Sequence, residues 1–251
     1  KELKAVTSLY DNIKRIWFDD DSFLIRTTEE IKLFAELYKK EIDMPFTCLA
    51  IPKNIQKNKI EFLVSAGMDN IQFGIESTTP RILKLYKRPC SKEDVLESTL
   101  TVKEVNNGKV FIHYDLILDN PWETDRERMD CLNFLKSLPR PYIISYFSLV
   151  FYPGVELSEM AKKDGFITDE LSEVYRKSYQ VPRATYVNLL FYMLKYYAVN
   201  KVPSFAMEIL SCKGVVAVLN NRLITIIFEV ISKIRTRRRY GRSSSQQKKL
   251  S

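Results

Sequence analysis

The sequence predicts an α/β fold, in which helices cover a parallel sheet, followed by an extension made only of helices. Over about the first 150 residues, short apolar runs alternate with amphipathic stretches of helical period. After Pro153 only helical patterns remain. Parallel strands need crossover connections, which usually pass through a helix. The alternation therefore favours either an α/β barrel or an open α/β sheet.

Five of the apolar runs are predicted strands, and five amphipathic stretches are predicted helices. The strands cover residues 15–18, 46–50, 70–75, 110–118 and 143–150, and the helices cover 2–13, 28–42, 54–66, 92–106 and 125–138. Thr28 and Ser91 are the predicted N-caps, because a hydroxyl can accept a free amide hydrogen of the first turn. Gly67 and Gly108 stand where a helix end favours a left-handed residue.

Two of the predicted strands carry polar side chains on one face. His113 and Asp115 alternate with apolar residues in the fourth strand, and Gln72, Gly74 and Glu76 do so in the third. A parallel sheet packed on both faces would bury such groups at a cost in free energy. A cavity lined by these two faces would explain the pattern.

The C-terminal extension is predicted to hold five helices, with Pro182 and Pro203 as breaks between them. These helices cover residues 155–163, 170–178, 184–200, 204–211 and 215–234. Aromatic side chains recur at helical spacing in the third of these helices, and we expect them to pack against the sheet rather than to bind a ligand. They are Phe191, Tyr192, Tyr196 and Tyr197.

The positive charge of the chain is confined to its last residues. The net charge is +8, from 39 Lys and Arg against 31 Asp and Glu. Residues 233–251 hold eight of the basic residues and no acid, so the rest of the chain is neutral. A role with nucleic acid or anionic lipid would belong to this tail, whose Ser and Gln content predicts disorder. The distribution argues against a nucleic-acid partner for residues 1–232.

Cysteine spacing excludes a local metal site of the usual kind. Cys48, Cys90, Cys131 and Cys212 lie at least 41 residues apart, so no C-x-x-C run exists. No signal peptide and no apolar span of 18 residues is found, which predicts a cytoplasmic location with reduced thiols. The chain opens at Lys1 without a methionine. We therefore expect it to be part of a longer protein.

Polar residues cluster at the predicted strand ends, which is where α/β proteins place their ligands. They are Asp19, Asp20 and Asp21 after the first strand, Gly74, Glu76 and Ser77 at the third, and Asp119, Asn120 and Glu123 after the fourth. The carboxylates could accept bonds from a ligand ammonium or hydroxyl group, or they could simply cap helices in solvated loops. A turn at residues 152–154 follows the fifth strand.

His113, the only histidine, shares its strand face with Asp115. A lone histidine within a strand is more often a hydrogen-bonded interior group than a catalyst, and both roles stay open here. The sequence contains no G-x-S-x-G, P-loop or G-x-G-x-x-G pattern. Serine hydrolases and Rossmann dinucleotide enzymes therefore lose support.

Taken in order, these strand ends resemble the radical S-adenosylmethionine (radical SAM) superfamily, in particular the branch that often carries an N-terminal cobalamin-binding domain. The matching segments are IWFDDDSF at 16–23, IQFGIES at 71–77, KRP at 87–89, LDNPWET at 118–124 and FYPGVEL at 151–157. The resemblance covers about residues 1–165, which leaves 166–232 as the helical extension and 233–251 as the basic tail.

The resemblance implies a partial (βα)6 TIM-like barrel that is truncated before its second strand. It also implies an enzyme in which a 4Fe-4S cluster cleaves S-adenosylmethionine to a 5′-deoxyadenosyl radical, which abstracts hydrogen from a small-molecule substrate. An electron donor such as flavodoxin or ferredoxin would supply electrons to the cluster. Cobalamin is implied only by the branch, since no residue of this chain supports it.

Residue by residue, the resemblance assigns expected neighbours of the cofactor. It places Asp19, Asp20 and Asp21 near the methionyl amino group, Gly74, Glu76 and Ser77 near the ribose or carboxylate, and Asp119, Asn120, Glu123 and Tyr146 beside the adenine. His113 and Asp115 would lie on the substrate side.

The chain departs from the family pattern at its cluster. The C-x-x-x-C-x-x-C loop and the strand before it are missing, so we expect no metal ligand in this chain and no activity from it alone. Asp119 also stands where the family commonly has glycine. A competing hypothesis is a cluster-free barrel that serves as a binding or scaffold module, with the tail contacting an anionic partner.

Overall fold

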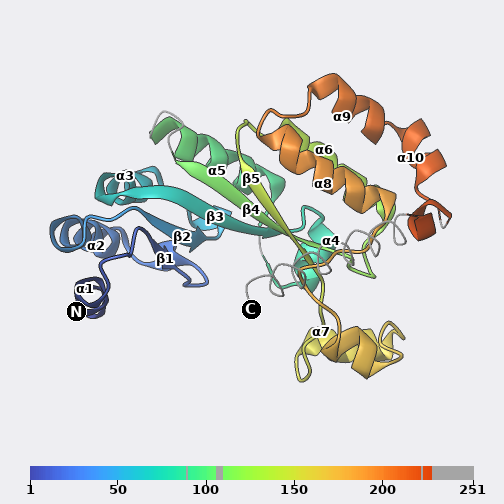
Figure 1. The fold of residues 1–251 in the computed structure, drawn as a ribbon, viewed down its shortest axis with the longest axis horizontal. Helices are drawn as coiled ribbons and strands as arrows, with labels where there is room; N and C mark the ends of the chain where they lie inside the picture. The colour runs from blue at the N-terminus through green and yellow to red at the C-terminus, as the bar shows by residue number, and fades with distance from the viewer. Residues whose placement is uncertain (89, 106–109, 222, 228–251) are drawn as a thin grey trace, which may run out of the picture.

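The computed structural model describes residues 1–88, 90–105, 110–221 and 223–227. Its centre is a five-stranded parallel sheet whose spatial order follows the chain, β1-β2-β3-β4-β5 (Figure 1). The strands are β1 (Ile16–Phe18), β2 (Phe46–Ala50), β3 (Met68–Glu76), β4 (Phe111–Leu118) and β5 (Ile143–Ser148). All five predicted strands are confirmed.

One helix precedes the first strand, and the others connect each strand to the next, as parallel pairing requires. They are α1 (Glu2–Leu9), α2 (Thr28–Glu41), α3 (Lys57–Ala66), α4 (Pro80–Leu85), α5 (Lys92–Val105) and α6 (Asp125–Ser137). Short 3-10 turns lie at Phe23–Ile25 and Pro52–Asn54. The order of elements, with every neighbouring pair parallel, is that of a partial α/β barrel, and it confirms the predicted fold class.

The two faces of the sheet differ in burial. Ile71 and Phe73 of β3 and Tyr114 of β4 are fully buried on the face that the helices cover. The alternate residues of the same strands, including Gln72 and His113, are only partly buried. The predicted polar face therefore exists, and it is the face of the sheet that α2, α3, α5 and α6 leave free.

Helix termini follow the expected chemistry with one change. The N-cap of α2 is Thr27 rather than Thr28, because Thr27 and Glu30 form a capping box. Ser91 and Asp94 exchange the same pair of bonds before α5, and Gly67 ends α3 in the left-handed region with φ +114°. Gly108 lies outside the described residues.

The extension is helical but more broken than predicted. It comprises α7 (Glu156–Lys163), a π-helical turn at Leu171–Tyr175, α8 (Tyr186–Ala198), α9 (Ser204–Ser211) and α10 (Lys213–Leu219). The α-helix expected over 170–178 is only this π turn. The helix expected over 215–234 is interrupted because α10 ends at Leu219, with Asn220 as its C-cap.

The extension shares its core with the sheet. Phe191 of α8 meets Tyr146 of β5 with ring centroids 5.6 Å apart, and Leu190 and Leu194 are fully buried in the same cluster. Phe191 therefore packs as expected, whereas Tyr192 and Tyr196 are largely exposed. Among the described residues no helix has both the length and the apolarity needed to cross a bilayer. The basic tail falls beyond the described ranges.

Candidate functional site

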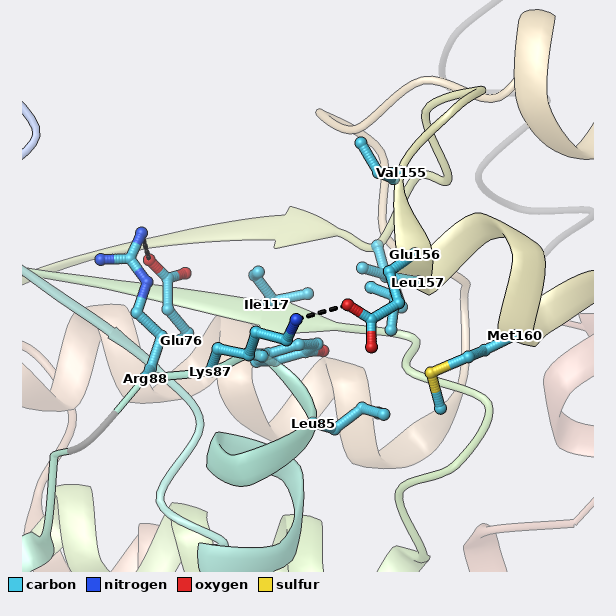
Figure 2. A pocket seen from close by; sticks show the side chains of 11 residues that line it. Glu76, Leu85, Lys87, Arg88, Ile117, Val155, Glu156, Leu157 and Met160 are labelled. Atoms are coloured by element: carbon cyan, nitrogen blue, oxygen red, sulfur yellow. Dashed lines mark hydrogen bonds and ion pairs between the residues drawn. The ribbon is translucent and has the colours of Figure 1, made fainter.

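A cavity of about 380 Å³ opens at the carboxyl ends of β3 and β4, between the loop after α4 and the start of α7 (Figure 2). Its wall is mainly apolar, with charged groups at the rim. The lining residues are Glu76, Leu85, Tyr86, Lys87, Arg88, Ile117, Leu149, Val155, Glu156, Leu157 and Met160. This position is the ligand-binding edge of parallel α/β proteins.

Glu76 enters this cavity because the end of β3 is irregular. The pairing of β3 with β4 shifts between Gly74 and Glu76. Glu76 has φ +64°, a backbone conformation that residues other than glycine rarely adopt. A Cβ atom at Gly74 would lie 2.9 Å from the Glu76 Oε1 atom. The missing side chain at Gly74 therefore leaves the space in which the Glu76 carboxylate sits.

Arg88 is the charged neighbour of Glu76. Its Nη2 atom lies 3.8 Å from the Glu76 Oε1 atom (Figure 2). Burial raises the pKa of the Glu76 carboxyl, Arg88 opposes that rise, and Asp115 adds to it. Glu76 is thus a largely but not fully buried acceptor, with 16% of its side chain exposed, whose charge is only partly balanced by the protein.

A second ion pair crosses the cavity mouth. Lys87, with φ +55°, is paired with Glu156 of α7 (Figure 2). Both side chains are largely exposed, so the pair adds little stability. It nevertheless connects the loop after α4 to α7 on the open side of the cavity.

The end of β4 is organised around the buried carboxylate of Asp119. Asp119 accepts hydrogen bonds from Ser148 Oγ at 2.7 Å, from the Arg183 amide at 2.8 Å and from Asn188 Nδ2 at 2.7 Å. Its φ of +61° lies in the left-handed region, which glycine adopts more readily than aspartate. These bonds connect the helical extension to the sheet, and they engage both oxygens of the Asp119 carboxylate with protein donors.

Other predicted cofactor neighbours support the loops around the cavity. Asn120 Nδ2 donates to the hydroxyl of Tyr86, a cavity residue, at 2.7 Å. Glu123 accepts from Ser77 Oγ at 2.9 Å. Ser77, Asn120 and Glu123 are almost fully buried. The structure thus brings Ser77, Asn120 and Glu123 together behind the wall of the cavity, and their contact with a cofactor stays a prediction.

The remaining predicted cofactor residues lie apart from this cavity. Asp19, Asp20 and Asp21 follow β1 and are exposed, and Asp20 pairs with Arg26 at 3.0 Å. Tyr146 is buried in β5, where Lys195 Nζ lies 4.8 Å from its ring centroid. Burial raises the pKa of the Tyr146 hydroxyl well above its usual value. Their cofactor roles also stay predictions.

His113 and Asp115 belong to a polar cluster on the free face of the sheet. His113 Nε2 lies 2.8 Å from Ser145 Oγ and 3.7 Å from Asp115 Oδ1, so Ser145 is its closer partner. Gln72 Nε2 donates to Asp115 Oδ2. Burial lowers the pKa of His113 to about 4, assisted by Lys195, and raises that of Asp115 to about 6. At neutral pH the imidazole is therefore neutral and the carboxylate mostly ionised.

The residues present do not fit an iron–sulfur cluster. In the described part of the chain, no three His, Cys, Asp or Glu side chains are grouped so that they could hold a metal. Cys48, Cys90 and Cys131 are buried separately, and Cys212 is exposed. Burial raises the pKa of the Cys48 thiol to about 12, which disfavours a thiolate ligand.

Sequence reasoning missed the partners of several predicted residues. Arg88 was expected only as part of a family segment, and its pairing with Glu76 follows from the loop after the unpredicted helix α4. Ser148 and Asn188 carry no local signal of their bonds to Asp119, because they are 29 and 69 residues away. Only the fold brings these groups together.

Comparison with known proteins identifies the family of the chain. The model of a family described as "Radical SAM superfamily" matches residues 3–135, which is more than half of the chain. An uncharacterized methyltransferase of Pyrococcus horikoshii, PH0819, is 24% identical over 191 residues. The match covers 66% of this chain, which spans only 40% of that relative.

Among solved structures, the radical SAM methyltransferase TsrM of Kitasatospora setae has a similar fold. With cobalamin and a 4Fe-4S cluster bound, it aligns with a TM-score of 0.54 and 14% identity, over 66% of this chain and 31% of TsrM. A second TsrM structure, with tryptophan and a SAM analogue, also gives a TM-score of 0.54. At this identity the likeness concerns the fold alone.

Proposed function

Since this chain belongs to the radical SAM superfamily, we propose that it is the C-terminal part of a radical SAM enzyme and that the cavity beside Glu76 binds S-adenosylmethionine. The observation that carries this proposal is the largely buried Glu76 carboxylate at the edge of an apolar cavity formed by the strand ends. The cavity volume, about 380 Å³, lies within the range of small-molecule sites.

The chemistry of the cavity suits this ligand. Ionised carboxylates accept hydrogen bonds from ribose hydroxyls or an ammonium group, and among the described residues Glu76 has only Arg88 as an ion-pair partner. Ile117, Leu149 and Met160 offer an apolar surface for the adenine and the methionyl side chain. When bound, S-adenosylmethionine would supply the 5′-deoxyadenosyl radical that abstracts hydrogen from a substrate.

The protein's own part in this reaction is to position the ligand. The Asn120–Tyr86 and Ser77–Glu123 hydrogen bonds hold the loops around the cavity, and Asp119 fixes the end of β4. Preorganised loops reduce the entropy lost on binding and keep the reacting groups aligned. The iron–sulfur cluster would require ligands from outside the described residues.

The remaining parts of the proposal rest on the family and on the relatives. A small-molecule substrate, an electron donor such as flavodoxin or ferredoxin, and a cytoplasmic location agree with radical SAM chemistry. The relative PH0819 and the TsrM structures are named as methyltransferases, and one TsrM structure holds cobalamin. Methyl transfer with cobalamin is therefore the first reaction to assay.

The test is S-adenosylmethionine binding by protein purified without oxygen, measured by equilibrium dialysis. We expect Glu76→Gln to weaken binding by about tenfold or more, because a charge-assisted hydrogen bond is lost. Glu97→Gln, an exposed glutamate on α5, is the matched control and should bind as the wild type does. Equal affinity in the Glu76 and Glu97 variants would remove Glu76 from the site and favour the scaffold hypothesis.

A further inference from the structure

The free face of the sheet holds hydrogen-bond acceptors that no protein group satisfies. Within the described residues, four buried amide or carboxylate oxygens have no hydrogen-bond partner, namely Asn70 Oδ1, Gln72 Oε1, Asp115 Oδ1 and Asn188 Oδ1. The first three lie on β3 and β4. Buried acceptors without donors are costly and uncommon in folded proteins.

These three oxygens share one face of the sheet. Asn70 and Gln72 are two residues apart in β3, so their side chains point to the same side. Gln72 pairs in register with His113, and Asp115 lies two residues further along the same face of β4. The bond from Gln72 Nε2 to Asp115 Oδ2 leaves Gln72 Oε1 and Asp115 Oδ1 as free acceptors side by side.

The neighbouring protein groups do not supply the missing donors. His113 Nε2 is engaged with Ser145 Oγ and remains 3.7 Å from Asp115 Oδ1. The nearest cation of α8, Lys195, lies over the rings of Tyr146 and Tyr192, at 4.8 and 5.3 Å from their centroids. Arg88 is directed to Glu76. A mostly ionised carboxylate thus stands among acceptors without a cation of its own.

We infer that this cluster recognises a protonated nitrogen of the substrate, an ammonium or amidinium group whose N–H donors reach Asp115 Oδ1 and Gln72 Oε1. A cation that also donates hydrogen bonds matches both the charge and the missing donors. A carboxylate or phosphate would meet Asp115 and Glu76 with like charge. The inference deepens the proposed function, since it assigns the substrate class of the same barrel interior and rests on that function.

The single histidine makes the inference directly measurable. His113 is adjacent to the cluster, so its ring proton resonances report binding there without any assignment problem. Butylammonium is a suitable probe, with butanol and butyrate as uncharged and anionic analogues. For a ligand of about five heavy atoms we expect saturable shifts at millimolar concentration, with no saturable response to butanol or butyrate.

Two variants complete the test. Asp115→Asn keeps the shape of the side chain and should weaken butylammonium binding by about tenfold or more. Asp69→Asn neutralises a partly exposed aspartate at the start of the neighbouring strand β3, which pairs with Arg15, and should leave binding unchanged. Equal responses to butylammonium and butanol, the absence of a response, or unchanged affinity in Asp115→Asn would each overturn the inference. S-adenosylmethionine binding, measured on the same samples, reports on the Glu76 site independently.

Discussion

Gly74 and Glu76 illustrate how one missing side chain shapes the cavity. The Glu76 carboxylate occupies the space where a Gly74 Cβ would stand, at 2.9 Å from Oε1. The obstacle is the end of a flexible side chain rather than backbone, so Glu76 can move aside. A substitution at Gly74 should therefore affect the position of the carboxylate more than the stability of the fold.

We predict that Gly74→Ala weakens S-adenosylmethionine binding by about tenfold, comparable to loss of the charge-assisted bond itself, with a change in unfolding free energy below about 1 kcal/mol. Equilibrium dialysis and urea unfolding measure the two quantities. Wild-type affinity in this variant would show that the carboxylate position does not matter for binding.

His113 and Asp115 should give the stability of the protein two opposing pH dependences. The pKa of Asp115 rises from 3.8 to about 6 on folding, so between these values the folded state holds more protons and stability falls as pH increases. The pKa of His113 falls from 6.5 to about 4, so the unfolded state holds more protons and stability rises with pH. The two effects nearly cancel in the wild type.

Single variants should separate these effects. As the pH rises from 4 to 6.5, the unfolding free energy of Asp115→Asn should increase relative to that of the wild type, by about 3 kcal/mol. That of His113→Gln should decrease by about the same amount. Urea unfolding at half-unit pH steps measures both slopes. Slopes of the same sign in the two variants would contradict the assigned burial of this pair.

Among elements, the capping boxes fix where helices begin next to the site. Thr124 accepts the Glu127 amide hydrogen at 3.3 Å, and Glu127 Oε2 accepts the Thr124 amide hydrogen at 2.8 Å. This box starts α6 directly after the loop of Asn120 and Glu123. Arg81 of α4 also bonds to Glu127. The start of α6 is thus connected to the loop that carries Tyr86.

We predict that Thr124→Ala destabilises the protein by about 1 kcal/mol, because an N-cap bond is lost. Thr124→Ser retains the hydroxyl and should recover most of that loss. Thermal unfolding compares the three proteins. A Thr124→Ser variant as unstable as Thr124→Ala would show that the methyl group, not the cap, is responsible.

The strands and most helices could be predicted from sequence, whereas the shortest helix of the sheet region could not. The strands follow from apolar runs, and α2, α5 and α6 from helical periodicity. Helix α4 has only six residues, too few for a periodic signal. The helix expected over 215–234 is interrupted at Asn220 and Asn221, whose side chains can compete with helical hydrogen bonds.

The candidate site was predictable in its residue types but not in its contacts. Glu76 and the polar strand face follow from the alternation in β3 and β4. The left-handed conformations of Glu76 and Asp119, and the shift in β3 pairing that places Glu76, have no signature in a single sequence. Such features depend on tertiary packing.

On the scale of the whole molecule, Asp119 joins the extension to the sheet. Its carboxylate receives donors from β5, from the Arg183 backbone and from α8. The shared hydrophobic cluster of β5 and α8 adds to this connection. The boundary predicted at residue 165 therefore separates two chain segments that share one hydrophobic core, formed by the sheet and by the helices after α7.

We predict that Asp119→Asn lowers the unfolding free energy by about 2–3 kcal/mol, because an amide NH2 would face protein donors in place of one carboxylate oxygen. In the variant, hydrogen exchange of the Arg183 amide should be accelerated over the wild type by a larger factor than that of amides within β3. Unchanged exchange at Arg183 would show that the carboxylate does not hold the extension.

The most direct test of the central claim is a crystal structure of the protein with S-adenosylmethionine bound. We predict the ligand in the cavity between Glu76 and Met160, with a ribose hydroxyl or the methionyl ammonium group within about 3 Å of the Glu76 carboxylate. A ligand bound elsewhere, with the Glu76 carboxylate still facing only Arg88, would contradict the account.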